Sequence, residues 1–247
     1  MVHIIVSDYK RLTLRVILSK TPKHSSFPKK FISLPLASTI ASVQIIYMAK
    51  LYFNYSTMNA GKSTLLLQAA HNYRERGMET YLLTAQMDTR AGQGKIASRI
   101  GIEEDSDTFN PQEDLFEKIK LKHAISKISC IFIDEAQFLT REQVWGLARV
   151  VDDLNIPVIC YGLRVDFMGE LFPGSAALLA LADEMREVRT ICHCGKKATM
   201  VVRLNSTGKA VTAGNQVQIG GNETYLSLCR KHYRETVMDE THPELPI

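Results

Sequence analysis

The sequence contains few cysteines and glycines for its length, and it lacks a long uninterrupted apolar run. Of its 247 residues, 5 are Cys, 14 are Gly and 8 are Pro. These counts exclude a small disulfide-stabilised protein and a collagen-like repeat. Hydrophobic residues make up 45% and charged residues 23%, which also excludes a wholly disordered chain. What remains is the composition of an ordinary soluble globular protein with one or two domains.

Acidic residues are almost absent from residues 1–47. That segment holds seven Lys or Arg and a single acid, Asp8, whereas residues 48–247 hold 23 bases and 25 acids. The formal net charge of +4 therefore belongs to the first fifth of the chain. It gives no argument for nucleic-acid binding by the rest, whose own balance is slightly negative.

The same segment lacks a sustained hydrophobic period. Its most apolar part, residues 31–48, is interrupted by Pro35 and by several Ser and Thr, and it is too polar for a membrane-spanning helix. Three interpretations of residues 1–47 stay open: an organelle transit peptide, a disordered tail, or a start codon assigned too far upstream, with Met48 as the true initiator.

From Met48 onward, predicted strands and helices alternate. Apolar patterning predicts strands at residues 51–55, 80–84, 128–133 and 157–161, and helices at residues 63–76, 113–126 and 140–154. Thr140 and Gln143 predict a capping box for the last helix. Residues 88–101, which hold four charges and three glycines, are expected to form a long loop. The alternation predicts an α/β fold with a doubly wound parallel sheet, followed after about residue 190 by a small second module.

A phosphate-binding loop follows the first predicted strand. Its residues fit the Walker A pattern except that Ser56 replaces the first glycine. Backbone N–H groups of such a loop surround phosphates, Lys62 reaches the terminal phosphates, and Ser63 offers a hydroxyl to Mg²⁺. The predicted strand before it and helix after it argue against a chance Gly-Lys-Ser. We expect the nucleotide to contact Ser56, Thr57, Met58, Asn59, Ala60, Gly61, Lys62 and Ser63.

Two acids follow the apolar strand predicted at residues 128–133. Asp134 is placed to hold Mg²⁺, directly or through water, and Glu135 to act on a proton near the γ-phosphate. The alternative is that the pair only caps the next turn. Because it follows a phosphate-binding loop in one α/β unit, the pair favours a P-loop enzyme that uses Mg-ATP.

Cysteine and histidine cluster in the second module. Cys192, Cys194, Cys229 and His232 supply three thiolates and one imidazole, a complete tetrahedral set for structural zinc, with His193 as a competing ligand. The ligands form two knuckles, Cys192 with Cys194 and Cys229 with His232. Two such knuckles favour metal binding over disulfides and therefore a cytoplasmic location.

The other two cysteines, Cys130 and Cys160, lie in predicted core strands and are expected to act as small hydrophobic residues. Between the knuckles, residues 201–228 predict two short strands with a glycine-rich tip. On the residues alone, this insert is either a loop that folds over a ligand or an ordinary β-hairpin.

Together these segments resemble the type II thymidine kinase family, which includes the human cytosolic enzyme and many bacterial ones. The resemblance runs in unbroken order from Met48 to about Glu235, is greatest for the enterobacterial-type enzymes, and does not include residues 1–47. The segments that carry it are residues 56–63, 88–90, 134–138, 161–167, 192–194 and 219–232. It implies an N-terminal extension (1–47), a P-loop ATP-binding domain (48–190), a zinc-binding lasso domain (191–235) and a C-terminal tail (236–247).

The resemblance also implies the activity, transfer of the ATP γ-phosphoryl group to the 5′-hydroxyl of thymidine to give dTMP. Glu135 would be the general base and Arg90 would stabilise the phosphates. The nucleotide-binding set would further include Asp134, Glu135, Ala136 and Gln137. The thymidine site would be built from Met58, Phe138, Phe167, the lasso residues Gln218, Ile219 and Gly220, and Tyr225, which makes the insert a substrate lid.

The same resemblance implies a homotetramer inhibited by thymidine triphosphate, with no nucleic-acid or membrane partner. A second hypothesis is a nucleic-acid-binding P-loop ATPase with a zinc module. The slightly acidic balance of residues 48–247 and the absence of a basic aromatic stripe argue against it.

Overall fold

The structure, a computed structural model, describes residues 3–4, 16–17, 48–217 and 224–238. The chain divides into two units, Met1–Ile45 and Ile46–Ile247. In the first unit the described residues are two short antiparallel strands, β1 (His3–Ile4) and β2 (Val16–Ile17). The rest of the predicted extension and of the C-terminal tail lies outside the described residues, as do the predicted site residues Gln218, Ile219 and Gly220.

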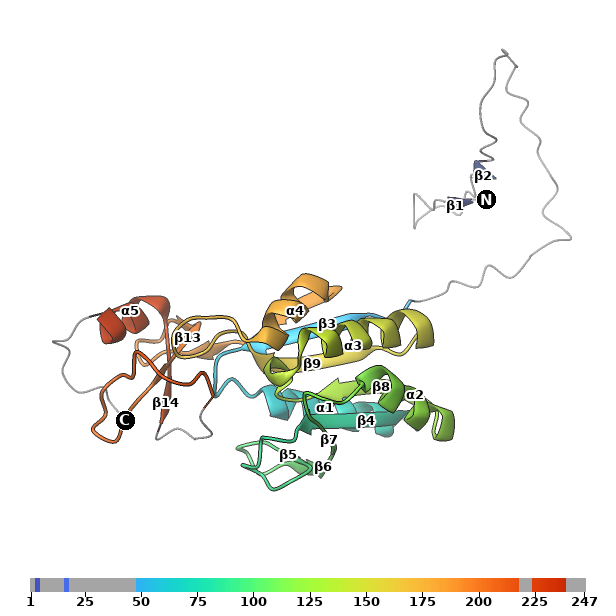
Figure 1. Cartoon of the computed structure of the whole chain (residues 1–247), viewed down its shortest axis with the longest axis horizontal. Helices are drawn as coiled ribbons and strands as arrows, with labels where there is room; N and C mark the ends of the chain where they lie inside the picture. Colours follow the sequence, from blue (N-terminus) through green and yellow to red (C-terminus); the bar gives the residue numbers. More distant parts are fainter. Residues whose placement is uncertain (1–2, 5–15, 18–47, 218–223, 239–247) are drawn as a thin grey trace, which may run out of the picture. The chain divides into compact units, whose positions relative to one another are not determined.

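A six-stranded parallel sheet forms the centre of the second unit (Figure 1). Its order is β10 (Glu184–Glu187), β3 (Leu51–Ser56), β9 (Val158–Leu163), β8 (Ile128–Ile133), β4 (Glu79–Ala85) and β7 (Asp107–Phe109). Every neighbouring pair is parallel. The four predicted strands are confirmed to within two residues, whereas the short edge strands β7 and β10 were not predicted.

Helices pack on both faces of this sheet, which confirms the doubly wound α/β fold. On one face lies α1 (Lys62–Arg74), and on the other lie α2 (Leu115–Ile125), α3 (Arg141–Leu154) and α4 (Pro173–Leu181). Successive residues of β8 alternate between the faces: Phe132 packs against α1, and Ile131 and Ile133 pack against the other three helices. Burial on both sides explains why this strand is apolar throughout.

The predicted capping box is present at the start of α3. The Thr140 hydroxyl accepts from the Gln143 backbone N–H at 3.2 Å, and the Gln143 side chain accepts from the Thr140 N–H at 3.0 Å. Gln143 also donates to the carbonyl of Asn110 at 2.7 Å. The cap therefore fixes both the helix start and the loop that precedes α2.

The prediction of a long loop over residues 88–101 was wrong in part. Within it, β5 (Lys95–Ala97) pairs antiparallel with β6 (Glu103–Asp105). The apolar signal is a single residue, Ile96, which is buried against α1, so no period of two is visible in the sequence. The predicted helix at 113–126 begins at Leu115, because the Asp114 carboxylate caps it by accepting from the Glu117 N–H.

The second module follows β10. It contains β11 (Thr190–Ile191) paired with β12 (Lys197–Ala198), β13 (Met200–Arg203) paired with β14 (Tyr225–Leu228), and α5 (Arg230–Met238). Its small core includes Val202 and Leu228 beside two of the cysteines. Across the described ranges, none of the helices has both the length and the apolar character needed to cross a bilayer.

Candidate active site

The phosphate-binding loop joins β3 to α1. Gly61 has φ 78° and Asn59 has φ 62°, so both lie in the left-handed region. Gly61 is the residue that caps α1, and a side chain there would be strained although no neighbouring atom would touch it. The left-handed backbone at Asn59 and Gly61 bends the loop around the start of α1, where the N–H groups of the helix favour an anion.

Ser56, at the place of the first Walker glycine, lies in extended backbone at the end of β3. Its hydroxyl donates to the carbonyl of Val188, and its φ is not positive. Glycine is therefore not required here for backbone geometry, which explains how the departure from the pattern is tolerated.

Lys62 is buried at the start of α1, and its Nζ donates to the Thr57 carbonyl at 2.8 Å. Burial lowers the pKa of Lys62, and the nearby carboxylates of Glu135 and Asp134 oppose that shift. The ammonium therefore lies in the loop interior, where the carboxylates of Glu135 and Asp134 favour its charged form, a position suited to phosphate oxygens.

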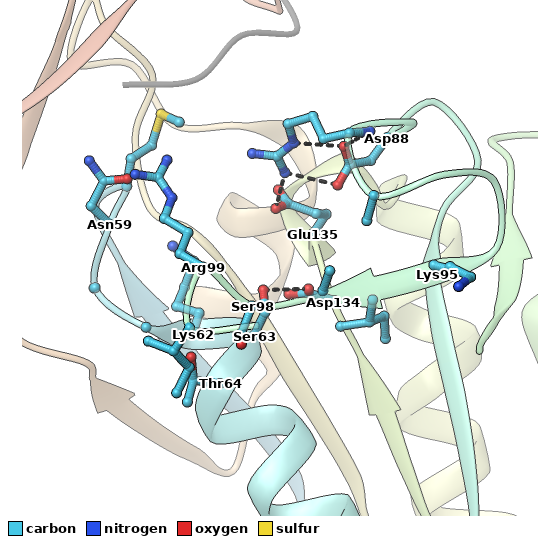
Figure 2. Close-up of a pocket in the computed structure, with 18 of the residues that line it drawn as sticks. Asn59, Lys62, Ser63, Thr64, Asp88, Lys95, Ser98, Arg99, Asp134 and Glu135 are labelled. Atoms are coloured by element: carbon cyan, nitrogen blue, oxygen red, sulfur yellow. Dashed lines mark hydrogen bonds and ion pairs between the residues drawn. The ribbon is translucent and has the colours of Figure 1, made fainter. Parts of the chain in front are cut away.

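Asp134 directly follows β8 and lies beside the start of α1. The Ser63 hydroxyl donates to Asp134 Oδ2 at 2.7 Å (Figure 2). Burial, with the neighbouring Glu135 charge, raises the pKa of Asp134 to about 7. Its Oδ1 is buried without a hydrogen-bond partner in the part of the chain that the structure describes. A carboxylate oxygen with no donor, beside a hydroxyl, fits the oxygen ligands that Mg²⁺ prefers.

Glu135 lies between an arginine and an amide. Arg90 donates to both oxygens of Asp88, at 2.7 and 2.8 Å, and to Glu135 Oε1 at 2.5 Å (Figure 2). The hydrogen-bonded carboxylates raise the pKa of Arg90, Asp88 most of all. Glu135 has φ 50°, a left-handed conformation that is uncommon for glutamate and that turns the chain into η1 (Ala136–Phe138).

Gln137 holds the other oxygen of Glu135. Its Nε2 donates to Glu135 Oε2 at 2.5 Å, while its Oε1 accepts from the backbone N–H of Leu163 at 2.9 Å. The amide is buried, so its two halves cannot exchange without breaking one of these contacts. Gln137 therefore fixes the carboxylate against the carboxyl end of β9.

A cleft of about 430 Å³ opens over the phosphate-binding loop. Met58 to Ser63, Arg90, Asp134 and Glu135 line it, so the structure brings most of the predicted nucleotide residues together. Residues 95–100 form the opposite wall, and Figure 2 shows Arg99 reaching toward Asn59 of the loop. This wall was not predicted, because residues 88–101 were expected to form a long loop and their short strand β5 shows no hydrophobic period.

A smaller pocket of about 60 Å³ adjoins the cleft. Met58, Phe138, Phe167 and Tyr225, all predicted to contact the nucleoside, line it together. Contributors that were not predicted include Phe172, whose ring lies edge-on to Phe138, and the polar residues Asp166 and Gln216. Asp166 stands next to Phe167 in a motif already singled out, which was the available signal.

Both pockets share a small set of lining residues. Met58, Arg90 and Glu135 border each of them, and Asp88 and Leu163 do the same. Of the residues predicted to bind the nucleotide, three line neither pocket: Ser56, Thr57 and the buried Ala136. The Glu135 carboxylate consequently faces the junction between a phosphate-type cleft and an aromatic pocket.

The phosphate-binding loop also contacts the second module. The Ser227 hydroxyl on β14 donates to the Met58 carbonyl at 2.7 Å. The Met58 side chain packs with Val201 and Tyr225 of the same module. The aromatic pocket is thus built from both parts of the unit.

Cys192, Cys194, Cys229 and His232 form one cluster whose ligand atoms all lie within 4.8 Å of one another. Cys194 Sγ and Cys229 Sγ are 3.9 Å apart, and His232 Nδ1 is 3.3 Å from Cys192 Sγ and 3.5 Å from Cys229 Sγ. A tetrahedral zinc would separate two sulfurs by about 3.8 Å and a sulfur from a nitrogen by about 3.5 Å. The donor set and its spacing therefore fit zinc.

Among the remaining candidates, His193 is not part of the cluster and stacks on the His232 ring at 4.3 Å. Cys130 and Cys160 are completely buried in β8 and β9, as expected for small hydrophobic residues.

Comparisons with known proteins place these observations in a family. The sequence model described as thymidine kinase matches residues 49–233. A thymidine kinase from Ruegeria pomeroyi is 70% identical over 78% of this chain and 97% of its own length. The thymidine kinase from Agrobacterium fabrum is 60% identical over 76% of this chain and 98% of its own length. A solved helicase from Candida albicans, 18% identical, covers 60% of this chain and 37% of its own with a TM-score of 0.38, too slight a likeness to carry an argument.

Proposed function

Because the chain belongs to the thymidine kinase family, we propose how its residues move the γ-phosphoryl group of ATP to the 5′-hydroxyl of thymidine. Phosphorylation of thymidine with ATP is the activity that the family gives to this chain. The observation that carries the proposal is the place of Glu135, which borders both the cleft and the aromatic pocket. A group there would reach both the acceptor hydroxyl of one substrate and the phosphoryl group that is transferred from the other.

The cleft over the phosphate-binding loop receives ATP. The triphosphate lies against the loop N–H groups and the start of α1, and Lys62 exchanges its contact with the Thr57 carbonyl for phosphate oxygens. Ser63 and Asp134 would hold Mg²⁺ through the hydroxyl and the carboxylate oxygen that lacks a donor. When bound, the ion supplies positive charge to the β- and γ-phosphate oxygens.

The aromatic pocket receives the nucleoside. Phe138, Phe167 and Tyr225 enclose a planar apolar ring, and Met58 completes the wall toward the phosphates. We also assign Gln218, Ile219 and Gly220 to the base, from the family resemblance alone.

The transfer step is an in-line displacement. The 5′-oxygen forms a bond to the γ-phosphorus, the bond from that phosphorus to the bridging oxygen of ADP breaks, and the hydroxyl proton moves to Glu135. Each Glu135 oxygen accepts one hydrogen bond, from Arg90 or from Gln137, and keeps a second lone pair for this proton. Arg90 would neutralise charge on the transferring group, since its guanidinium borders the cleft.

The Cys3His cluster would hold one structural zinc. With four protein ligands there is no open position for water, so its role is to fix the base of the insert between β13 and β14. From the resemblance we further assign a cytoplasmic homotetramer, inhibited by thymidine triphosphate, with no nucleic-acid partner.

Phosphate transfer by the purified chain tests the proposal. With ATP and Mg²⁺, thymidine is expected to be converted to dTMP, followed by chromatography of the products. The control is the same assay with a purine deoxynucleoside. If the folded protein phosphorylates no pyrimidine deoxynucleoside, the proposal fails.

A further inference from the structure

One wall of the aromatic pocket belongs to no strand in the described part of the chain. Residues 211–217 follow the turn that comes after β13, and Gln216 and Val217 line the pocket. Near its start the segment is fixed by one backbone hydrogen bond, from the Val211 N–H to the Arg203 carbonyl. Farther along, the Asn215 carbonyl and the Gln216 side chain are hydrogen-bonded to side chains of other parts of the fold, Arg203 and Asp166.

Asp166 holds the segment at Gln216. The Asp166 side chain is only 2% exposed. Its Oδ1 accepts from the backbone N–H groups of Met168 and Glu170, at 2.8 and 2.9 Å, which fixes the carboxylate in its own turn. Its Oδ2 accepts from Gln216 Nε2 at 2.9 Å. One oxygen thus anchors the carboxylate and the other holds the pocket wall.

Arg203 holds the same segment one residue earlier. Its Nη1 donates to the Asn215 carbonyl at 2.8 Å, and its Cζ lies 3.8 Å from the centroid of the Phe167 ring. The side chain is buried, and within the described residues it forms no salt bridge. A buried guanidinium without a carboxylate is costly, so its stacking and its carbonyl contact are what retain it.

The approach of the segment to Arg203 is close. Gly214 has φ 132°, and a Cβ added there would lie 2.8 Å from Arg203 Nη2. A larger residue would have to push the guanidinium away from Phe167. Glycine at this position therefore permits the contact between wall and arginine.

We propose that Asp166 and Arg203 are positioning residues that hold residues 215–217 as a preformed wall of the nucleoside pocket and thereby set the affinity for thymidine. The inference rests on the proposed function, because it takes the aromatic pocket as the nucleoside site. Two adjacent residues, Asp166 and Phe167, fix two adjacent residues of the wall, Gln216 directly and Asn215 through Arg203. A wall ordered before binding spares the nucleoside the entropy cost of ordering it.

Exchanging the hydrogen-bond donor and acceptor between Gln216 and Asp166 tests their contact. Gln216→Glu places a second carboxylate against Asp166, and we expect the KM for thymidine to rise about tenfold while the KM for ATP and kcat change little. Adding Asp166→Asn restores a donor opposite an acceptor, because the new amide oxygen still accepts the two turn N–H groups and its NH₂ donates to the glutamate. The double variant should recover most of the thymidine affinity.

Arg203→Lys tests the second contact. The lysine keeps the charge but loses the planar stack on Phe167, so the KM for thymidine should rise about fivefold. Lys209→Ala, an exposed change in the neighbouring turn, is the matched control. Thermal unfolding of each variant separates loss of fold from loss of affinity.

The outcomes are distinct. A wild-type protein that phosphorylates no thymidine overturns the proposed function and leaves nothing for these variants to modify. An active wild type whose Gln216→Glu and Arg203→Lys variants keep the thymidine KM within about twofold overturns the positioning role. So does a double variant that shows no recovery, because a general structural loss would not be repaired by exchanging donor and acceptor.

Discussion

Glu135→Gln removes the proposed base with the smallest possible change of shape. The glutamine cannot take the 5′-hydroxyl proton, and general bases contribute about 10²- to 10⁴-fold to rate. We therefore expect kcat to fall by about 10²- to 10⁴-fold, equivalent to roughly 3 to 5 kcal/mol in the barrier. The KM values for ATP and thymidine should change much less, because neither the phosphate-binding loop nor the aromatic rings are altered.

The same substitution has a local cost that the structure defines. The glutamine oxygen can accept from Arg90, but its NH₂ then faces the NH₂ of Gln137, donor against donor. Gln137 cannot turn to relieve this without losing the Leu163 N–H. One buried donor is left unpaired, which costs about 1–3 kcal/mol of stability.

Steady-state kinetics and urea unfolding measure the two effects separately. Glu142→Gln, the same chemical change at an exposed position of α3, is the matched control and should leave both quantities near wild type. Glu135→Asp keeps a carboxylate but withdraws it from its partners, so it should retain more kcat than the glutamine variant. If Glu135→Gln keeps kcat within about threefold of wild type, Glu135 is not the base.

Three further predictions concern other parts of the site and fold. Lys62→Ala should lower kcat by at least about 10²-fold in the same assay, because the buried ammonium is the cation inside the phosphate-binding loop; near-normal kcat would contradict its role. Metal analysis should find about one zinc per chain, and Cys229→Ser should reduce that content and raise the thymidine KM; active protein without metal would refute the zinc site. Thr140→Ala should lower the free energy of unfolding by about 1 kcal/mol in urea without changing kcat, because it removes the cap of α3; an unchanged unfolding curve would refute that estimate.

The parts of the fold that could be predicted are those that depend on short sequence patterns of neighbouring residues. The apolar run of β8, the capping box at Thr140 and the loop ending in Lys62 each depend on neighbours within a few residues. Short elements with one buried residue, such as β5 around Ile96, show no hydrophobic periodicity from which a strand could be predicted. The helix α4 is apolar nearly throughout, so its sequence shows no amphipathic face.

The site divides in the same way. The acid pair after the apolar strand predicted Glu135 near the γ-phosphate, the family resemblance supplied the aromatic residues, and the structure brings them to one junction. The contacts of Asp166 with Gln216 and of Arg203 with Phe167 span 50 and 36 residues of sequence. Such pairs arise only when β13 is placed beside the carboxyl end of β9. The position of β13 relative to β9 cannot be predicted from any local pattern in a single sequence.

The hydrogen bond from Ser227 to the Met58 carbonyl has a thermodynamic consequence. It joins the loop proposed to bind the nucleotide to the strand that carries Tyr225, which lines the proposed nucleoside pocket. If nucleotide binding changes the strength of this single bond, the affinity for the nucleoside changes by some factor. Linkage then requires the nucleoside to change nucleotide affinity by the same factor. Titrating each substrate in the presence and absence of a non-reactive form of the other would give that factor twice, and the two values must agree.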